Sequence, residues 1–102
     1  MEGRKYIKNK IIMKKINFNT LKAHRHLGDN ATTTINVRKL LTDVIYSGPF
    51  GMAGHALAHK LYETDGDVEL SEEECQLVRT AAQSFNEPYA IDAILNAVRK
   101  EE

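Results

Sequence analysis

The spacing of apolar residues changes near residue 37, and this change constrains the fold more than any other feature of the sequence. Before it, Ile16 and Phe18 alternate with polar neighbours, which is typical of a half-buried strand. A turn cluster at 27–30 comes next, and the almost continuous β-branched residues between 32 and 37 predict a returning strand. The first part of the chain is therefore expected to form a β-hairpin.

Four apolar stripes with helical spacing follow the hairpin, separated by turn-forming residues. The stripes are Val37, Leu40, Leu41 and Val44; Phe50, Ala53, Leu57 and Leu61; Cys75, Val78, Ala82 and Phe85; and Ile91, Ile94, Leu95 and Val98. Asn36 is the expected N-cap of the first helix, which should run to about Tyr46, and Pro49 suits the first turn of the second. The sequence thus predicts a mainly helical α+β domain, an N-terminal β-hairpin followed by four short α-helices. Its core should be rich in alanine, including Ala53, Ala81 and Ala82.

The length of 102 residues fits one small domain. The sequence MKKINF reads as a fresh start at Met13, so we interpret residues 1–12 as a basic N-terminal extension and residues 13–102 as the globular domain. No run of about 18 apolar residues could span a bilayer, and the N-terminus lacks the apolar stretch of a secretory signal. With Cys75 as the single cysteine, these features predict a cytoplasmic protein without a membrane partner. Because Cys75 lies in an apolar stripe, we expect its side chain to be buried.

The net charge of zero conceals a division along the chain. Residues 1–26 carry eight Lys or Arg and one acid, whereas residues 27–102 carry six basic residues and thirteen acids. The two segments therefore have opposite formal charges, which fits either a nucleic-acid-binding arm or head-to-tail contacts between identical chains. The residues expected to meet phosphates are Arg4, Lys5, Lys8, Lys10, Lys14 and Lys15, with Tyr6 and Phe18 available for base stacking.

The stretch YETDGDVELSEEE has the acidic spacing of a calcium loop. Aligned with the twelve positions of an EF-hand loop, Glu63, Asp65, Asp67 and Glu74 fall at ligand positions 1, 3, 5 and 12. Two departures count against calcium. Position 1 is Glu63 instead of the shorter Asp, and position 6 is Val68, where the sharp turn calls for glycine.

A capped helix explains the same residues. Asp65 and Gly66 can close one helix, and Ser71 with Glu74 forms the S-x-x-E pattern of a capping box at the start of the next. We therefore favour the capped helix, and keep a metal-responsive module with an EF-hand-like loop as the third functional hypothesis.

His55 and His59 are four residues apart and could share a zinc ion on one helix face. His24 and His26 alternate on the expected strand, and could complete a four-ligand site only if the hairpin packed against the second helix. Ala56 stands where a metalloprotease helix needs glutamate. The His55 and His59 pair lies opposite the buried stripe, so a polar outer face or a partner surface is the favoured interpretation.

No motif in the sequence favours catalysis. Gly48, Gly51 and Gly54 recur every third residue, but neither the lysine of a P-loop nor the pattern of a dinucleotide-binding turn accompanies them. No Ser/His/Asp or Cys/His set follows a known spacing. We expect a non-enzyme that needs no cofactor.

The segments MKKINF, VRKLLTDVIY, AHKLYETDGDVELSEEE and AILNAV span most of residues 13–98. In this pattern the chain resembles small proteins encoded by bacteriophages and integrated elements of gut bacteria, which have no assigned activity. The resemblance implies an origin, a fold and a location in the bacterial host or the virion, and it assigns no functional residue. It also weighs against calcium, because the acidic positions vary among such proteins.

These features predict a protein-interaction or assembly module that self-associates or binds another phage or host protein. The expected contact surface is the outer face of the second helix, made by Met52, His55, His59 and Tyr62. The alternative is a nucleic-acid-binding accessory protein that uses the basic N-terminal segment.

Overall fold

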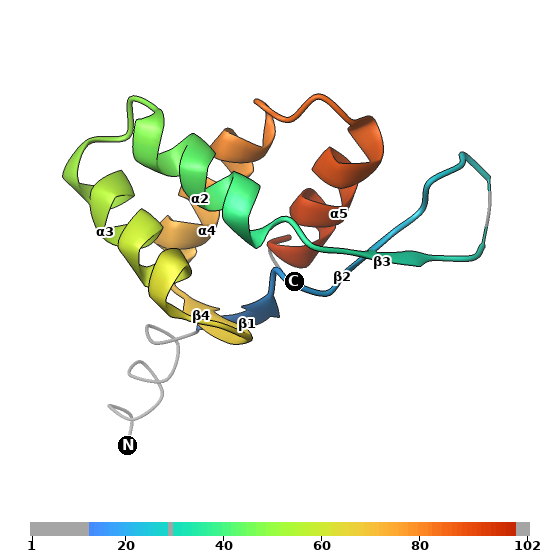
Figure 1. Cartoon of the computed structure of the whole chain (residues 1–102), viewed down its shortest axis with the longest axis horizontal. Helices are drawn as coiled ribbons and strands as arrows, with labels where there is room; N and C mark the ends of the chain where they lie inside the picture. The colour runs from blue at the N-terminus through green and yellow to red at the C-terminus, as the bar shows by residue number, and fades with distance from the viewer. Residues whose placement is uncertain (1–12, 29, 100–102) are drawn as a thin grey trace, which may run out of the picture.

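The computed structural model describes residues 13–28 and 30–99 and arranges them as short strands and helices (Figure 1). The expected N-terminal extension, residues 1–12, lies outside the described residues. The elements in chain order are β1 (Lys14–Asn17), β2 (Leu21–Ala23), β3 (Thr33–Ile35), α2 (Arg38–Ser47), α3 (Gly51–Glu63), β4 (Asp67–Leu70), α4 (Glu72–Ala82) and α5 (Pro88–Ala97). The α+β class and the succession of four helices after the hairpin are confirmed.

The strands form two separate antiparallel pairs, and only one of them is the expected hairpin. β2 pairs with β3, with Leu21 opposite Ile35 and Ala23 opposite Thr33. The strand that holds Ile16 is β1, and it pairs with β4 instead, so that Ile16 lies opposite Val68. A turn at 17–20 separates β1 from β2, because the amide of Asn19 donates to the Asn17 side chain and the amide of Thr20 donates to the Asn17 carbonyl.

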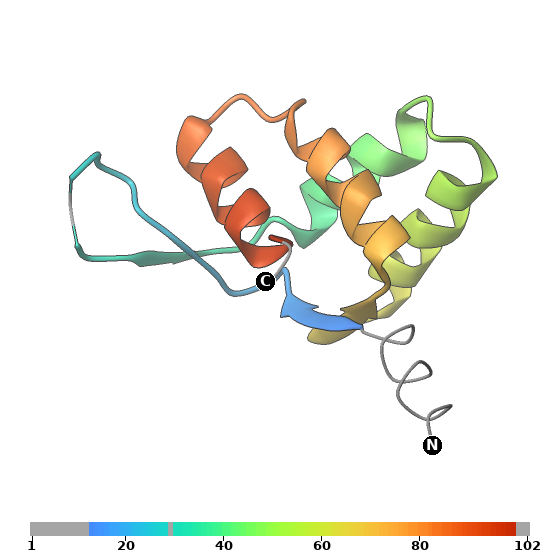
Figure 2. The ribbon, with the colours of Figure 1, turned by 180° about the vertical axis from the view of Figure 1, so that it is seen from behind.

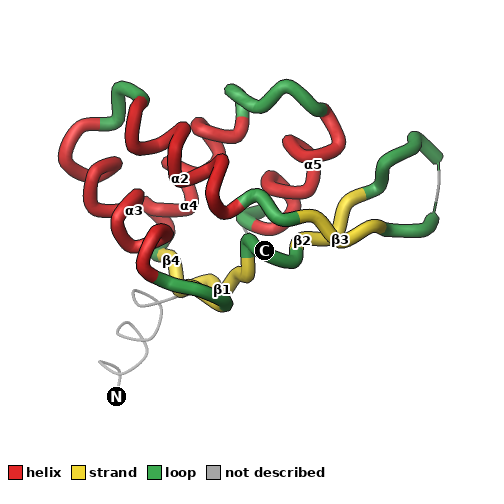
Figure 3. The backbone as a smooth tube through the Cα atoms, in the orientation of Figure 1, coloured by secondary structure: helices red, strands yellow, loops and turns green. Residues whose placement is uncertain are grey.

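The hairpin projects from one end of the molecule, and the helices form the body. In Figure 1, α2 and α3 lie in front of α4, and the view from behind shows α4 and α5 in front (Figure 2). The long connection between β2 and β3 extends away from the helices (Figure 3). β2 packs against α5, and α2 packs most extensively against α3.

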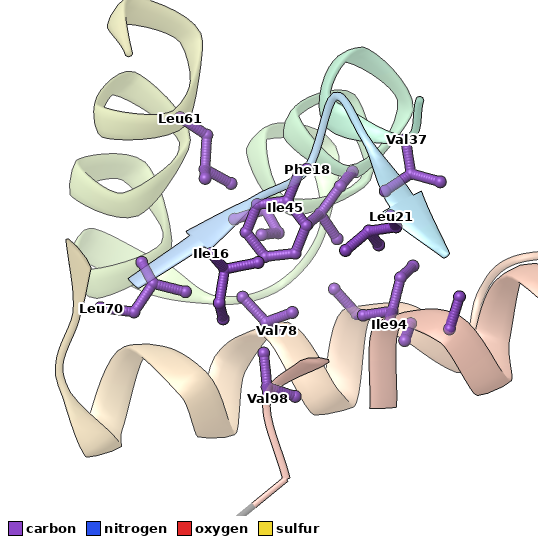
Figure 4. Close-up of a cluster of buried hydrophobic side chains, with 14 of the residues drawn as sticks. Ile16, Phe18, Leu21, Val37, Ile45, Leu61, Leu70, Val78, Ile94 and Val98 are labelled. Atoms are coloured by element: carbon purple, nitrogen blue, oxygen red, sulfur yellow. The ribbon is translucent and has the colours of Figure 1, made fainter. Parts of the chain in front are cut away.

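One core joins the sheet of β1 and β4 to the helices. Figure 4 shows Phe18 surrounded by side chains from several elements, among them Ile45 of α2, Val78 of α4 and Ile94 of α5. Each of these four side chains is at most 1% exposed. Cys75 is also buried, as expected, and burial raises the pKa of its thiol, with the nearby carboxylate of Glu72 adding to the effect.

Two residues expected in the core are exposed. Leu40 is 50% exposed, whereas Thr42 of the same helix is buried. The hydroxyl of Thr42 donates to the Arg38 carbonyl at 2.7 Å, so this buried polar group has a partner. Ala53 is exposed, whereas its neighbour Gly54 is buried. A Cβ atom at Gly54 would collide with Phe50, so the close approach at the start of α3 requires glycine there. Ala81 and Ala82 are fully buried, as expected.

The expected helix starts are displaced by one or two residues at α2 and α3. The N-cap of α2 is Val37, but the side chain of Asn36 still accepts a hydrogen bond from the amide of Arg38 at 3.1 Å. α3 begins at Gly51, two residues after Pro49, with Phe50 as its N-cap. At α5 the proline is the first helical residue, in agreement with the preference of proline for that position.

Arg38 joins the start of α2 to the end of α3. Its guanidinium group donates to the carbonyl oxygens of Leu61, Tyr62 and Thr64 at 3.0–3.2 Å. The Nε atom donates to the side chain of Asn19, which in turn donates to Asp65 at 2.9 Å. The last carbonyls of a helix have no partner within the helix. Arg38 therefore supplies donors that the end of α3 lacks.

We predict that Arg38→Lys lowers the free energy of unfolding by about 1–3 kcal/mol. Nη1 bonds the three carbonyls and Nε bonds Asn19, and the single nitrogen of lysine cannot serve both groups of acceptors at once. Urea unfolding measures the change. Lys39→Met is the matched control, because Lys39 is exposed and adjacent. Equal stability of the two variants would contradict the capping role of Arg38.

Candidate functional site

The outer side of α3 carries the residues that the sequence singled out as a contact surface. Met52 and Tyr62 are 78% and 73% exposed, and His55 and His59 are exposed between them. The opposite side of α3 is buried, through Gly54, Leu57, Ala58 and Leu61. Because the four exposed residues are three or four positions apart, they form one strip along the helix.

α2 adds an aromatic residue to this strip that the sequence analysis did not include. The ring of Tyr46, which is 61% exposed, lies 5.9 Å from the His55 ring and 6.0 Å from the His59 ring, between centroids. The two histidine rings are 4.6 Å apart. We call the surface formed by Tyr46, Met52, His55, His59 and Tyr62 the α2–α3 face. The sequence could have indicated that Tyr46 is exposed, because Tyr46 lies outside the apolar stripe of its helix.

A shallow groove runs between the two helices on this face. It has a volume of about 250 Å³ and is lined by Thr42, Asp43, Tyr46, Ala58, His59 and Tyr62. Asp43 is the only Asp, Glu, Lys or Arg residue of this set. The groove is therefore a surface for apolar and aromatic groups more than for ions.

The four carboxylates of the calcium hypothesis do not come together. Among residues 13–28 and 30–99, no three His, Cys, Asp or Glu side chains are placed to hold a metal ion. Asp65 accepts a hydrogen bond from Asn19 and lies 3.9 Å from the Arg38 guanidinium. Val68 is buried in β4, where an EF-hand loop would need its sharp turn. The acidic stretch is the end of α3, followed by β4 and the start of α4.

The capping box at the start of α4 is present. The hydroxyl of Ser71 accepts from the amide of Glu74 at 3.2 Å, and the Glu74 carboxylate accepts from the amide of Ser71 at 2.9 Å. Lys60 of α3 donates to the same carboxylate at 2.9 and 3.1 Å. Burial alone would raise the pKa of Glu74, but the hydrogen bonds from Lys60 and Ser71 and the charge of Lys60 outweigh it and lower this pKa below its usual value.

The hairpin histidines lie far from those of α3. His24 and His26 follow β2, and Figures 1 and 2 both place the hairpin at the opposite end of the helical body from α3. They line an open crevice of about 540 Å³ between the hairpin and α5, together with Lys22, Leu27, Asp92 and Asn96 among others. The set of four histidines within one chain is therefore not assembled.

The basic residues of the nucleic-acid hypothesis are only partly described. Arg4, Lys5, Lys8 and Lys10 lie outside the described residues. Lys14 and Lys15 belong to β1, and the ammonium group of Lys15 lies 3.9 Å from the carboxylate of Glu69 on β4. This part of the basic segment is a strand whose charge is partly balanced by its partner strand.

Comparison with known proteins assigns no relative. No protein-family model, curated protein or solved structure matches this chain. In the described part of the chain, every helix is too short or too polar to cross a membrane.

The capping box predicts that Ser71→Ala destabilises the fold by about 0.5–2 kcal/mol, because an amide at the start of α4 loses its acceptor. Urea unfolding is the measurement, with Ser84→Ala as the control because Ser84 is exposed beyond the end of α4. Calcium at about 1 mM is enough to fill even the weak calcium sites of extracellular modules. At this concentration it should leave the melting temperature of the wild-type protein unchanged. A calcium-dependent rise that Glu74→Gln abolishes would contradict this account of the stretch.

The interaction between Lys60 and Glu74 predicts a pH-dependent contribution to stability. Since the folded-state pKa of Glu74 is lowered from 4.5, ionised Glu74 stabilises the fold above the unfolded-state pKa, and this contribution is lost as the pH falls through the lower folded-state value. Glu74→Gln keeps an acceptor for the Ser71 amide but removes the ion pair. The difference in unfolding free energy between wild type and variant should therefore be largest near neutral pH and decline in acid. A difference that does not vary with pH would contradict the ion-pair contribution.

Proposed function

We propose that this protein acts by binding protein, with no catalysis, and that its partner on the α2–α3 face is a second copy of the chain. The observation that carries the proposal is the exposure of Tyr46, Met52 and Tyr62, at 61%, 78% and 73%, on one face of two packed helices. Aromatic residues and methionine are enriched in protein interfaces. Large exposed apolar groups that gather on one face are a mark of contact surfaces.

The charge of the face supports a second copy as the partner. In a two-fold symmetric contact, each surface patch meets the same patch of the other chain. A patch with several charges of one sign would then repel itself. None of the five residues that define the α2–α3 face is an aspartate, glutamate, lysine or arginine. Apart from Asp43, which lines the groove, the α2–α3 face therefore brings no like charges together when it meets its own copy.

The helix arrangement also suits such a contact. α2 and α3 are adjacent along the chain and packed together, so two copies that meet through them would bring four helices into one bundle-like layer. The resemblance of several segments to small phage and mobile-element proteins supports an accessory role encoded by such an element. The resemblance does not itself identify a partner.

We predict that Tyr62→Glu weakens self-association at least about tenfold, which corresponds to about 1.4 kcal/mol, because two copies of the new carboxylate would be buried near each other. Sedimentation equilibrium at micromolar to tens of micromolar protein, the order of magnitude of weak interfaces, measures the effect. The matched control is Leu27→Glu, which changes a fully exposed apolar residue on the hairpin.

The control should associate as wild type does. A wild-type chain that stays monomeric over this range, whatever metal ions are present, would contradict the proposed function. Equal weakening by both substitutions would place the contact elsewhere than on the α2–α3 face.

A further inference from the structure

His55 and His59 stand one helical turn apart with the spacing of two ligands of one metal ion. Zinc–nitrogen bonds of about 2.0–2.1 Å place each imidazole centroid about 3.2 Å from the ion. For angles at the metal from about 90° to the tetrahedral value, the two centroids are then about 4.5–5.2 Å apart. The observed distance between the ring centroids is 4.6 Å, which lies within this range.

The two imidazoles are also available. Within the described residues, their rings lie beside each other and beside the ring of Tyr46. The carboxylates of the acidic stretch differ in this respect, because Glu74 and Asp65 already accept hydrogen bonds from Lys60 and Asn19. The ring of Tyr46, from α2, lies beside both histidine rings.

We propose that His55 and His59 form a two-imidazole site for a late first-row divalent metal ion, with Zn²⁺ as the reference ion, and that two copies of the chain share this ion. Imidazole suits zinc, copper and nickel, whereas calcium and magnesium prefer oxygen ligands. The pair offers two of the four positions of a tetrahedral site. Since no described group of three ligands exists within one chain, the same two histidines of a second copy complete the set.

The symmetry of the proposed contact accounts for this completion. A two-fold axis that passes close to the pair brings His55 and His59 of both copies around one point. The metal would then favour the associated state, because it binds four ligands in the dimer and only two in the monomer. This inference rests on the proposed self-association through the α2–α3 face and adds its ligand.

The test combines a zinc titration with a mass measurement. Isothermal calorimetry with ZnCl₂ should give one ion for two chains. Sedimentation with added Zn²⁺ should show association at least about tenfold tighter than in EDTA, a change of about 1.4 kcal/mol. His55→Ala and His59→Ala should each abolish both effects, while retaining the circular dichroism spectrum of wild type because both residues are exposed. His26→Ala, on the hairpin, is the matched control and should behave as wild type.

The outcomes separate this inference from the proposed function. Association that is the same in Zn²⁺ and EDTA, and is unaffected by both α3 variants, overturns the metal site and leaves protein binding in place. Binding of one ion to each chain without association also overturns it. A chain that is monomeric in EDTA and dimeric in Zn²⁺ supports it. A chain that is monomeric under both conditions overturns both proposals.

Discussion

The guanidinium group of Arg38 holds together the part of the molecule from which the candidate site is built. The end of α3 has no glycine cap, since its C-cap residue Thr64 has an extended backbone, and its final carbonyls need donors from elsewhere. Arg38 supplies them from the first residue of α2, at 27% side-chain exposure. This contact fixes the start of α2 against the end of α3. The other ends of the two helices are joined by the short connection at residues 48–50, and Tyr46 meets His55 there.

The acidic stretch shows how local context decides the use of carboxylates. Alternation of Val68 and Leu70 with polar residues places both side chains in the core and makes the segment a strand against β1. Asp67 is exposed on this strand, while Asp65 accepts a hydrogen bond from Asn19, and the carboxylates do not gather around one point. Glu74 is instead committed to a helix start and to Lys60. The same residue types that resemble a calcium loop thus stabilise a junction between a strand and two helices.

The contact surface follows from how α3 divides its residues. Gly54, Leu57 and Leu61 face the core and permit close packing on α2, which leaves the residues on the other side of the helix to solvent. Those residues are methionine, histidine and tyrosine, where lysine and glutamate would be usual for a solvated face. Because these side chains are apolar, aromatic or imidazole groups, the α2–α3 face is a candidate for protein binding and the histidine pair is a candidate for binding a metal ion.

The sequence by itself determined the four helices, the capping box at Ser71 and Glu74, the burial of Cys75 and the outer placement of His55 and His59. These features depend on periodicity and on residues within about four positions of one another, which any local pattern records. The tertiary structure decided the pairing of β1 with β4, the acceptors of Arg38, the exposure of Leu40 and Ala53, and the meeting of Tyr46 with the two histidines. Each of these joins residues from different elements, such as Asn19 and Asp65, or depends on which neighbour fills a shared space, as Phe50 does above Gly54. Such choices are made by packing and by the satisfaction of backbone groups across the whole chain, and no spacing within one element encodes them.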